Sequence, residues 1–200
     1  MKIVVVGGTG TIGQAVVSAL KSTHEVLLAT RSGGDITLDM TDKASIESMF
    51  KSLEEFDALV VASGKVHFGA LDEMNDETYR IGLDNKLMGS VNLALAAIPY
   101  LNYGGSITLT TGILNRSPIV QGSSAAMVNG ALEGFVQASA IEMPRGIRIN
   151  AVSPTVITEA MPAYGDYFKG YIPVDAATAA QAYVKSIEGA HTGQVYCVEG

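Results

Sequence analysis

The chain has 200 residues, 16% of them charged and 48% hydrophobic, with a formal net charge of −7. This length suffices for one α/β domain whose core needs no disulfides, and the negative charge argues against a nucleic-acid-binding protein, which would present a basic face. The three histidines and single cysteine show no ligand spacing, so we expect no metal site.

The apolar segments are too short to cross a membrane, and no signal-peptide pattern precedes the first predicted strand. We therefore expect a soluble, cytoplasmic protein with a small-molecule ligand and no nucleic-acid or membrane partner. Abundant alanine and glycine with few charges predict closely packed helices whose apolar faces one small domain leaves partly uncovered, so we also expect a homo-oligomer. Cys197 lies in an apolar terminal strand, where we expect a buried, unreactive side chain.

The first predicted elements are a strand, a glycine-rich turn and a helix. Residues 1–6 form an apolar, β-branched run typical of a buried parallel strand. The turn Gly7-Gly8-Thr9-Gly10-Thr11-Ile12-Gly13 follows directly, and residues 14–21 show helical spacing. The glycines allow a tight turn, close approach to a ligand and close packing of the helix. Because a helix N-terminus suits a pyrophosphate, this context predicts a dinucleotide site rather than a purely structural turn.

Strands and helices alternate along the rest of the chain. We predict strands at 25–30, 36–38, 56–62, 106–110, 148–152 and 194–198, and helices after a cap at Thr41 and at 78–101, 123–143 and 176–187. This alternation predicts a single doubly wound, Rossmann-type α/β domain: a seven-stranded parallel sheet with helices on both faces. Residues at about 155–175 are rich in aromatic side chains and form either a mobile lid or a lobe packed on its own aromatic residues.

The end of the second predicted strand bears on the choice of dinucleotide. An NAD site usually has an acidic residue here that binds the ribose 2′-OH, whereas this strand ends in Thr30-Arg31-Ser32. Arg31 can pair with a 2′-phosphate, and Ser32 can add a hydrogen bond. Asp35 lies too far along and is interpreted as a loop residue. NADP is therefore predicted over NAD, with a solvated surface charge as the alternative role of Arg31.

Two longer segments resemble a known family. Gly105–Gly112 is similar to the fifth-strand segment of the short-chain dehydrogenase/reductase family, and Ile141–Pro154 is similar to the stretch leading to its cofactor-binding loop. The resemblance covers essentially the whole chain. It implies hydride transfer between a nicotinamide cofactor and a small carbonyl or alcohol. It also implies a homodimer or homotetramer formed through the helices at 78–101 and 123–143.

The resemblance fails at the catalytic positions. The family's serine, tyrosine and lysine positions fall on Gly112, Ala125 and Asn129, and its asparagine position falls on Lys86. A positioned general acid typically contributes about 10²–10⁴ in rate, and alanine holds no proton to donate. The chain is therefore either an NADP-dependent oxidoreductase with a degenerate active site or a catalytically inactive NADP-binding sensor or partner subunit.

Two side chains are weak candidate substitutes for the missing acid. Lys86 can stabilise an oxyanion or bind an acidic ligand, the alternative being a surface ion pair. His67 can act as an acid near neutral pH, the alternative being a polar residue in a surface loop. From the turn, the strand ends and the resemblance together, the predicted cofactor-binding residues are Gly7, Thr9, Gly10, Thr11, Ile12, Gly13, Arg31, Ser32, Asp39, Met40, Ala62, Ser63, Gly64, Thr110, Asn129, Pro154 and Ile157.

Overall fold

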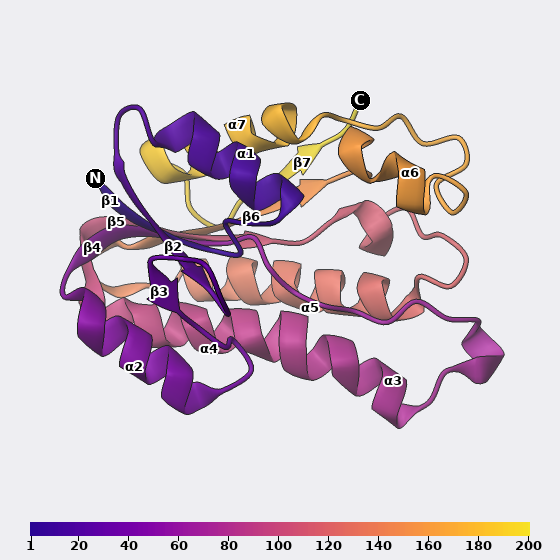
Figure 1. Ribbon diagram of the computed structural model, residues 1–200, viewed down its shortest axis with the longest axis horizontal. Helices are drawn as coiled ribbons and strands as arrows, with labels where there is room; N and C mark the ends of the chain where they lie inside the picture. The colour runs from indigo at the N-terminus through magenta and orange to yellow at the C-terminus, as the bar shows by residue number, and fades with distance from the viewer.

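A seven-stranded sheet in which all paired strands are parallel forms the centre of the computed structural model, which describes residues 1–200 (Figure 1). The strands are β1 (Lys2–Val6), β2 (Glu25–Thr30), β3 (Ile36–Thr37), β4 (Phe56–Val61), β5 (Leu101–Thr110), β6 (Arg148–Pro154) and β7 (Val195–Val198). Their order across the sheet is β3-β2-β1-β4-β5-β6-β7. The predicted doubly wound α/β fold is thus confirmed. The strand order reverses between β1 and β4, which is where ligands of such sheets bind.

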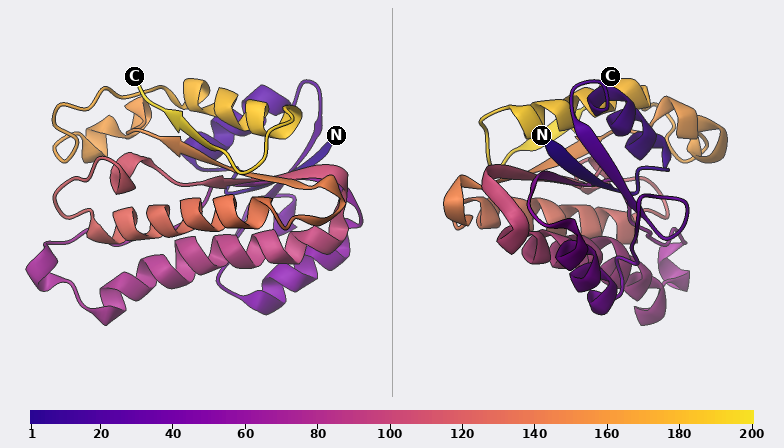
Figure 2. Two further views of the ribbon diagram at one scale, coloured as in Figure 1. Left: turned by 180° about the vertical axis from the view of Figure 1, so that it is seen from behind. Right: turned by 60° about the vertical axis from the view of Figure 1, so that its left-hand side comes forward.

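Helices cover both faces of the sheet (Figures 1 and 2). One face carries α1 (Thr11–Leu20) and α7 (Ala176–Glu188), and the other carries α2 (Lys43–Leu53), α4 (Met88–Ala97) and α5 (Ser123–Ala140). Two shorter helices are α3 (Asp76–Arg80), which continues into α4 through the π-helical segment Ile81–Leu87, and α6 (Met161–Tyr164), which lies between β6 and α7. No helix combines the length and the hydrophobicity that a bilayer crossing requires.

Strand β1 shows why the first apolar run does not alternate with polar residues. Ile3 and Val5 pack in the apolar cluster under α1 and α7, whereas Val4 and Val6 pack in the larger cluster under α2, α4 and α5. All four side chains are buried. A central parallel strand covered by helices on both sides is apolar on both faces.

Several element ends differ from the sequence predictions. The cap of α2 is Asp42, whose carboxylate accepts a hydrogen bond from the Ala44 N–H, and not Thr41, whose hydroxyl instead donates to Asp39. The predicted helix at 78–101 is divided by its π-helical segment. Strand β5 begins at Leu101 rather than at residue 106, because Leu101 pairs with Phe56 before a register shift in β4.

The expectation of a buried Cys197 is wrong. This side chain is exposed, because β7 pairs with β6 alone and forms an edge of the sheet. The apolar pattern of the strand does not reveal its position at the edge.

Candidate functional site

The glycine turn between β1 and α1 forms the centre of the candidate cofactor site. Gly7 has a φ of +80°, and a Cβ built on Gly13 would lie 2.1 Å from the Gly7 carbonyl oxygen. Only glycine therefore allows α1 to start this close to β1. The helix begins at Thr11, its N-cap Gly10 provides no side-chain hydrogen bond, and its first turn has no acidic residue. Its first N–H groups are thus left for an anionic ligand.

A groove of about 560 Å³ runs from this turn across the carboxyl ends of β1, β2 and β4. The predicted cofactor residues that line it follow these three strands and β3: Gly7, Thr9, Arg31, Ser32, Asp39, Met40, Ser63 and Gly64. A second cavity of about 740 Å³ shares Thr9 with the groove and includes Gly10 and Thr11. The two cavities therefore meet at the glycine turn.

The groove contains charged side chains of both signs. Arg31 is exposed and forms no ion pair. The Asp35 carboxylate accepts a hydrogen bond of 2.8 Å from the Leu28 N–H, so it stabilises the local backbone. The hydroxyl and N–H of Thr41 donate to Asp39, and these hydrogen bonds hold the pKa of Asp39 below its usual value. Asp39 is therefore an ionised acceptor within the groove.

Lys86 and Asn129 are joined by a direct hydrogen bond across the catalytic positions. The Lys86 Nζ donates to Asn129 Oδ1 at 2.8 Å and to the Thr111 carbonyl oxygen at 3.3 Å. The Asn129 amide in turn donates to the Gly112 carbonyl oxygen at 3.1 Å. Burial lowers the pKa of Lys86 to about 8. The structure therefore places an ammonium at the end of β5, and Lys86 is not part of a surface ion pair.

Residues 11–196 match the family model described as enoyl-(acyl carrier protein) reductase. The chain belongs to the short-chain dehydrogenase/reductase family. It is 47% identical to the protein lin1944 from Listeria innocua, whose crystal structure it matches with a TM-score of 0.98 over 99% of each chain. It is 30% identical to a small-chain dehydrogenase solved in complex with NADPH, with a TM-score of 0.90 over 100% of this chain and 96% of that one.

An uncharacterized oxidoreductase of Methylorubrum extorquens is 29% identical over 147 residues. These residues make up 72% of this chain and 58% of that relative. The chain thus matches less than two thirds of the relative's length.

The family's tyrosine position lies in an apolar cluster. Ala125 is buried with Ile113, Leu114, Val156 and Phe168, so residues from α5, the β5 loop, the β6 loop and the aromatic segment meet here. Phe168 also packs edge-on against Tyr171, with ring centroids 5.2 Å apart. The aromatic segment therefore packs on its own rings and shares an apolar cluster with Ala125, to which the resemblance assigns the family's tyrosine position.

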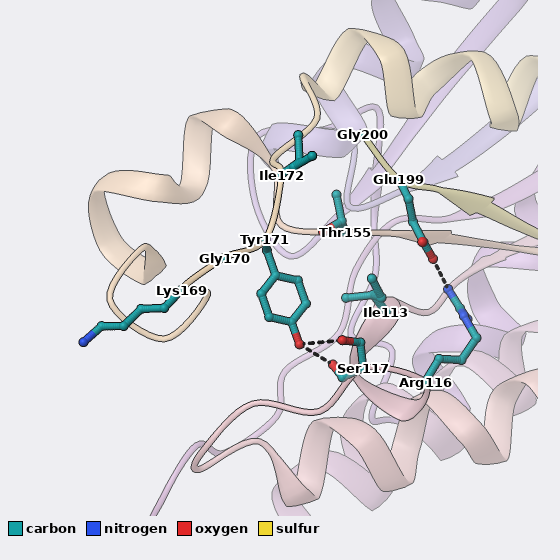
Figure 3. A pocket seen from close by; sticks show the side chains of 10 residues that line it. All are labelled: Ile113, Arg116, Ser117, Thr155, Lys169, Gly170, Tyr171, Ile172, Glu199 and Gly200. Carbon is teal, nitrogen blue, oxygen red and sulfur yellow. Dashed lines mark hydrogen bonds and ion pairs between the residues drawn. The ribbon is translucent and has the colours of Figure 1, made fainter.

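A third cavity, of about 520 Å³, lies beside this cluster (Figure 3). Tyr171 points across it, and its hydroxyl donates to the Ser117 carbonyl oxygen at 2.8 Å. Arg116 faces Glu199 and pairs with it at 3.3 Å, whereas Lys169 points away from the cavity. The two charged side chains that face each other across this space, Arg116 and Glu199, are thus paired with one another.

Other predicted site residues lie outside the groove lining. The Thr110 hydroxyl donates to the Val61 carbonyl oxygen and lies 2.6 Å from the Tyr183 hydroxyl, so it is engaged within the fold. Ile157 is buried and forms an isolated bridge with Val174. His67 is half-buried in the segment after β4 and has no hydrogen-bond partner. The remaining three are Ile12, Ala62 and Pro154, which are half-buried or buried next to the strand ends.

Sequence reasoning did not include several groove residues among the cofactor contacts. Thr41, Lys65 and Asn85 line the groove beside the predicted residues. Thr41 and Lys65 could have been identified from the sequence, because each follows closely after the end of a predicted strand. Asn85 carried no such signal, because only the packing of the π-helical segment brings it to β4, where its side chain accepts a hydrogen bond from the Lys65 N–H.

Proposed function

We propose that this protein is an NADP-dependent oxidoreductase that transfers hydride to or from a small carbonyl or alcohol. One observation carries the proposal: the open N-terminus of α1 lines one cavity, the unpaired Arg31 lines the groove, and these two spaces meet at Thr9 in the glycine turn. The 30% identical small-chain dehydrogenase in complex with NADPH and the relative named as an oxidoreductase support it. The bound cofactor would supply the hydride.

The residues of the groove fit the parts of the proposed cofactor. The N–H groups of Thr11 and Ile12 suit the pyrophosphate, and Arg31 with Ser32 suits the 2′-phosphate. Asp39 and Met40 suit the adenine edge. The small residues 62–64, at the end of β4, leave room for a ribose, and Thr110, Pro154 and Ile157 offer backbone beyond it.

A second candidate function is a catalytically silent NADP-binding sensor or partner subunit. The burial of Ala125 in the same apolar cluster as Phe168 favours it, because this position of the resemblance then holds no hydroxyl to donate a proton. Gly112 likewise lacks the serine hydroxyl. The two candidates share the cofactor and differ in turnover.

Fluorescence titration with NADPH and with NADH measures binding directly and tests the cofactor proposal that both candidates share. The Arg31→Ala variant should lose about 10–100-fold in NADPH affinity, since charge-assisted hydrogen bonds typically contribute about 1.5–3 kcal/mol. NADH, which lacks the 2′-phosphate, should bind both proteins equally. Arg80→Ala removes an exposed arginine on α3 that pairs with Asp76, and it should change neither affinity.

Two results would contradict the cofactor proposal. One is a wild-type protein that binds neither dinucleotide, and the other is an Arg31→Ala variant whose affinity for NADH falls as much as its affinity for NADPH. Oxidation of NADPH with a panel of aldehydes and ketones then separates the two candidates. Turnover that depends on an added carbonyl supports the oxidoreductase. Tight NADPH binding with no turnover supports the sensor.

The proposed assembly is a homodimer or homotetramer through α4 and α5. Met88 and Leu95 on α4 and Met127 on α5 are exposed, which is costly for a protein that remains a monomer. Light scattering coupled to size exclusion measures the assembly directly. Leu95→Glu should shift it towards the monomer if this face is the interface.

A further inference from the structure

Lys86 is a cation held without an anion. Its aliphatic stem packs against Gly64, where an added Cβ would lie 2.6 Å from Lys86 Cγ. The ammonium donates to Asn129 Oδ1 and to the Thr111 carbonyl oxygen, which are both neutral acceptors. A lysine ammonium has three N–H donors, so one is left over. Lys86 is half-buried, so this remaining donor can be reached by a ligand. Charged groups held on neutral partners are costly, and groups with a perturbed pKa cluster at functional sites.

The titratable groups on the neighbouring elements do not provide this compensation. Glu133 on α5 accepts hydrogen bonds from Thr111, Asn115 and Arg116. Asp84, on the same π-helical segment as Lys86, is exposed. The remaining groups are Lys65 and His67 on the segment after β4 and Tyr79 on α3. None of them pairs with Lys86, and burial is the cause of its lowered pKa.

The strand order locates this ammonium relative to the groove. The groove lies over the carboxyl ends of β2, β1 and β4, which are consecutive in the sheet. The next strands along the same edge are β5 and β6. A dinucleotide whose adenosine half fills the groove must therefore extend its other half over β4, β5 and β6. Lys86 touches Gly64 after β4 and Thr111 after β5, so it lies in that second half.

We propose that Lys86 binds the nicotinamide half of the cofactor through its ammonium, with hydroxyl or carbonyl oxygens of that half as the acceptors. This inference rests on the proposed function. Asn129, at the position where the family resemblance places a lysine, anchors the ammonium from the opposite helix. The two side chains have thus exchanged positions across the site: the charge comes from the π-helical segment, and the amide comes from α5.

The test compares two probes that share the adenosine half. NADPH carries both halves, whereas 2′,5′-ADP carries only the adenosine half with its 2′-phosphate. In the wild-type protein, the ammonium is present below a pH of about 8 and is lost above it. NADPH affinity should therefore fall about tenfold between pH 7 and pH 9, because only the protonated fraction binds well. Affinity for 2′,5′-ADP should stay constant over the same range.

The variant Lys86→Gln keeps a donor for Asn129 and removes the charge. It should lose about tenfold or more in NADPH affinity at pH 7, its NADPH affinity should not change with pH, and it should bind 2′,5′-ADP like the wild type. The exchange variant Lys86→Asn/Asn129→Lys returns an ammonium from α5 and should recover most of the affinity and the pH dependence. Lys51→Gln, which removes an exposed lysine on α2 that pairs with Glu47, should keep the wild-type affinity and pH dependence.

The outcomes separate the two levels of the proposal. If the wild type binds neither probe, the proposed function fails and this inference fails with it. If the wild type binds both probes but Lys86→Gln binds NADPH normally at every pH, this inference alone is overturned. It is also overturned if Lys86→Gln weakens both probes equally and lowers the melting temperature, because that result indicates a merely structural lysine.

Discussion

The two ends of the candidate site are built from different parts of the chain. The β1–α1–β2 end depends on main-chain groups: a glycine turn, the N-terminus of a helix and the ends of adjacent strands. The β5–α5 end depends on side chains from three separate segments, namely Lys86, Asn129 and Phe168, and on the Thr111 carbonyl oxygen as an acceptor. Main-chain groups are the same in every residue, so the glycine turn of the first end needs only its conformation preserved, and Arg31 is the side chain that we propose adds specificity there. A contact between two side chains can place the charge on either residue, so the residue types at the second end can vary more than those at the first.

Added Cβ atoms show the same difference between the ends. At Gly13 a Cβ would meet the backbone of Gly7 and Gly8 within 2.8 Å. At Gly112 it would meet nothing closer than the Asn129 amide nitrogen at 3.3 Å. Packing therefore requires the glycine in the first end, whereas the absence of a serine at Gly112 is not a steric necessity.

The largest expected effect is at Gly13. Gly13→Ala forces α1 away from β1, so we expect a loss of about 2 kcal/mol or more in the free energy of unfolding. NADPH binding should become undetectable, because the helix N-terminus moves with the turn. Urea unfolding and fluorescence titration measure the two effects.

Gly10→Ala provides the matched control for Gly13→Ala. Here the added Cβ has only one neighbour, the Gly7 carbonyl oxygen at 3.5 Å, which is an ordinary contact. Stability should therefore change little. NADPH affinity should still fall, because the methyl group enters the cavity lined by Thr9 and Thr11. Equal loss of stability in both variants would contradict the steric explanation.

The next largest effect is expected from rebuilding the family's catalytic residues in the second end. The triple variant Gly112→Ser/Ala125→Tyr/Asn129→Lys should lose about 2–4 kcal/mol in the free energy of unfolding. The new tyrosine must displace Phe168 from its cluster, and the new lysine meets the Lys86 ammonium. Gly112→Ser alone should cost about 1 kcal/mol or less, because the Asn129 amide nitrogen, 3.3 Å from the added Cβ, has to move only slightly.

Adding Lys86→Asn to the triple variant separates these two causes. It removes the like-charge contact and should recover part of the lost stability, and the cost of moving Phe168 should remain. If the quadruple variant is no more stable than the triple one, the Lys86–Asn129 contact is not the source of the loss.

The fold was predictable because its signals are local. The apolar run of β1, the glycine turn and the βα alternation each depend on neighbouring residues, and together they determine a parallel sheet. The wrong predictions concern residues whose role depends on contacts outside their own segment. Asp42 rather than Thr41 caps α2 because Thr41 bonds to Asp39, and Cys197 is exposed because nothing pairs beyond β7.

The candidate site was predictable only at its main-chain end. Gly7, Arg31 and Asp39 were named from strand ends, and the structure places them in one groove. The contact between Lys86 and Asn129 was not predicted, because no local pattern links residues on different helices. Their positions in the family resemblance were both visible, yet only the structure shows that the two side chains meet.

The smallest expected effect is at Tyr171, and it tests whether the aromatic segment is held mainly by its polar contact or by its rings. Tyr171→Phe removes a hydroxyl that lies 2.8 Å from both the carbonyl oxygen and the Oγ of Ser117. The free energy of unfolding should fall by about 1 kcal/mol. The free energy of local opening in residues 161–172, measured by amide hydrogen exchange, should fall by a similar amount. Because the ring still packs against Phe168, the cluster around Ala125 should remain intact. Faster exchange that extends into α5 would show instead that this hydroxyl stabilises the whole second end of the site.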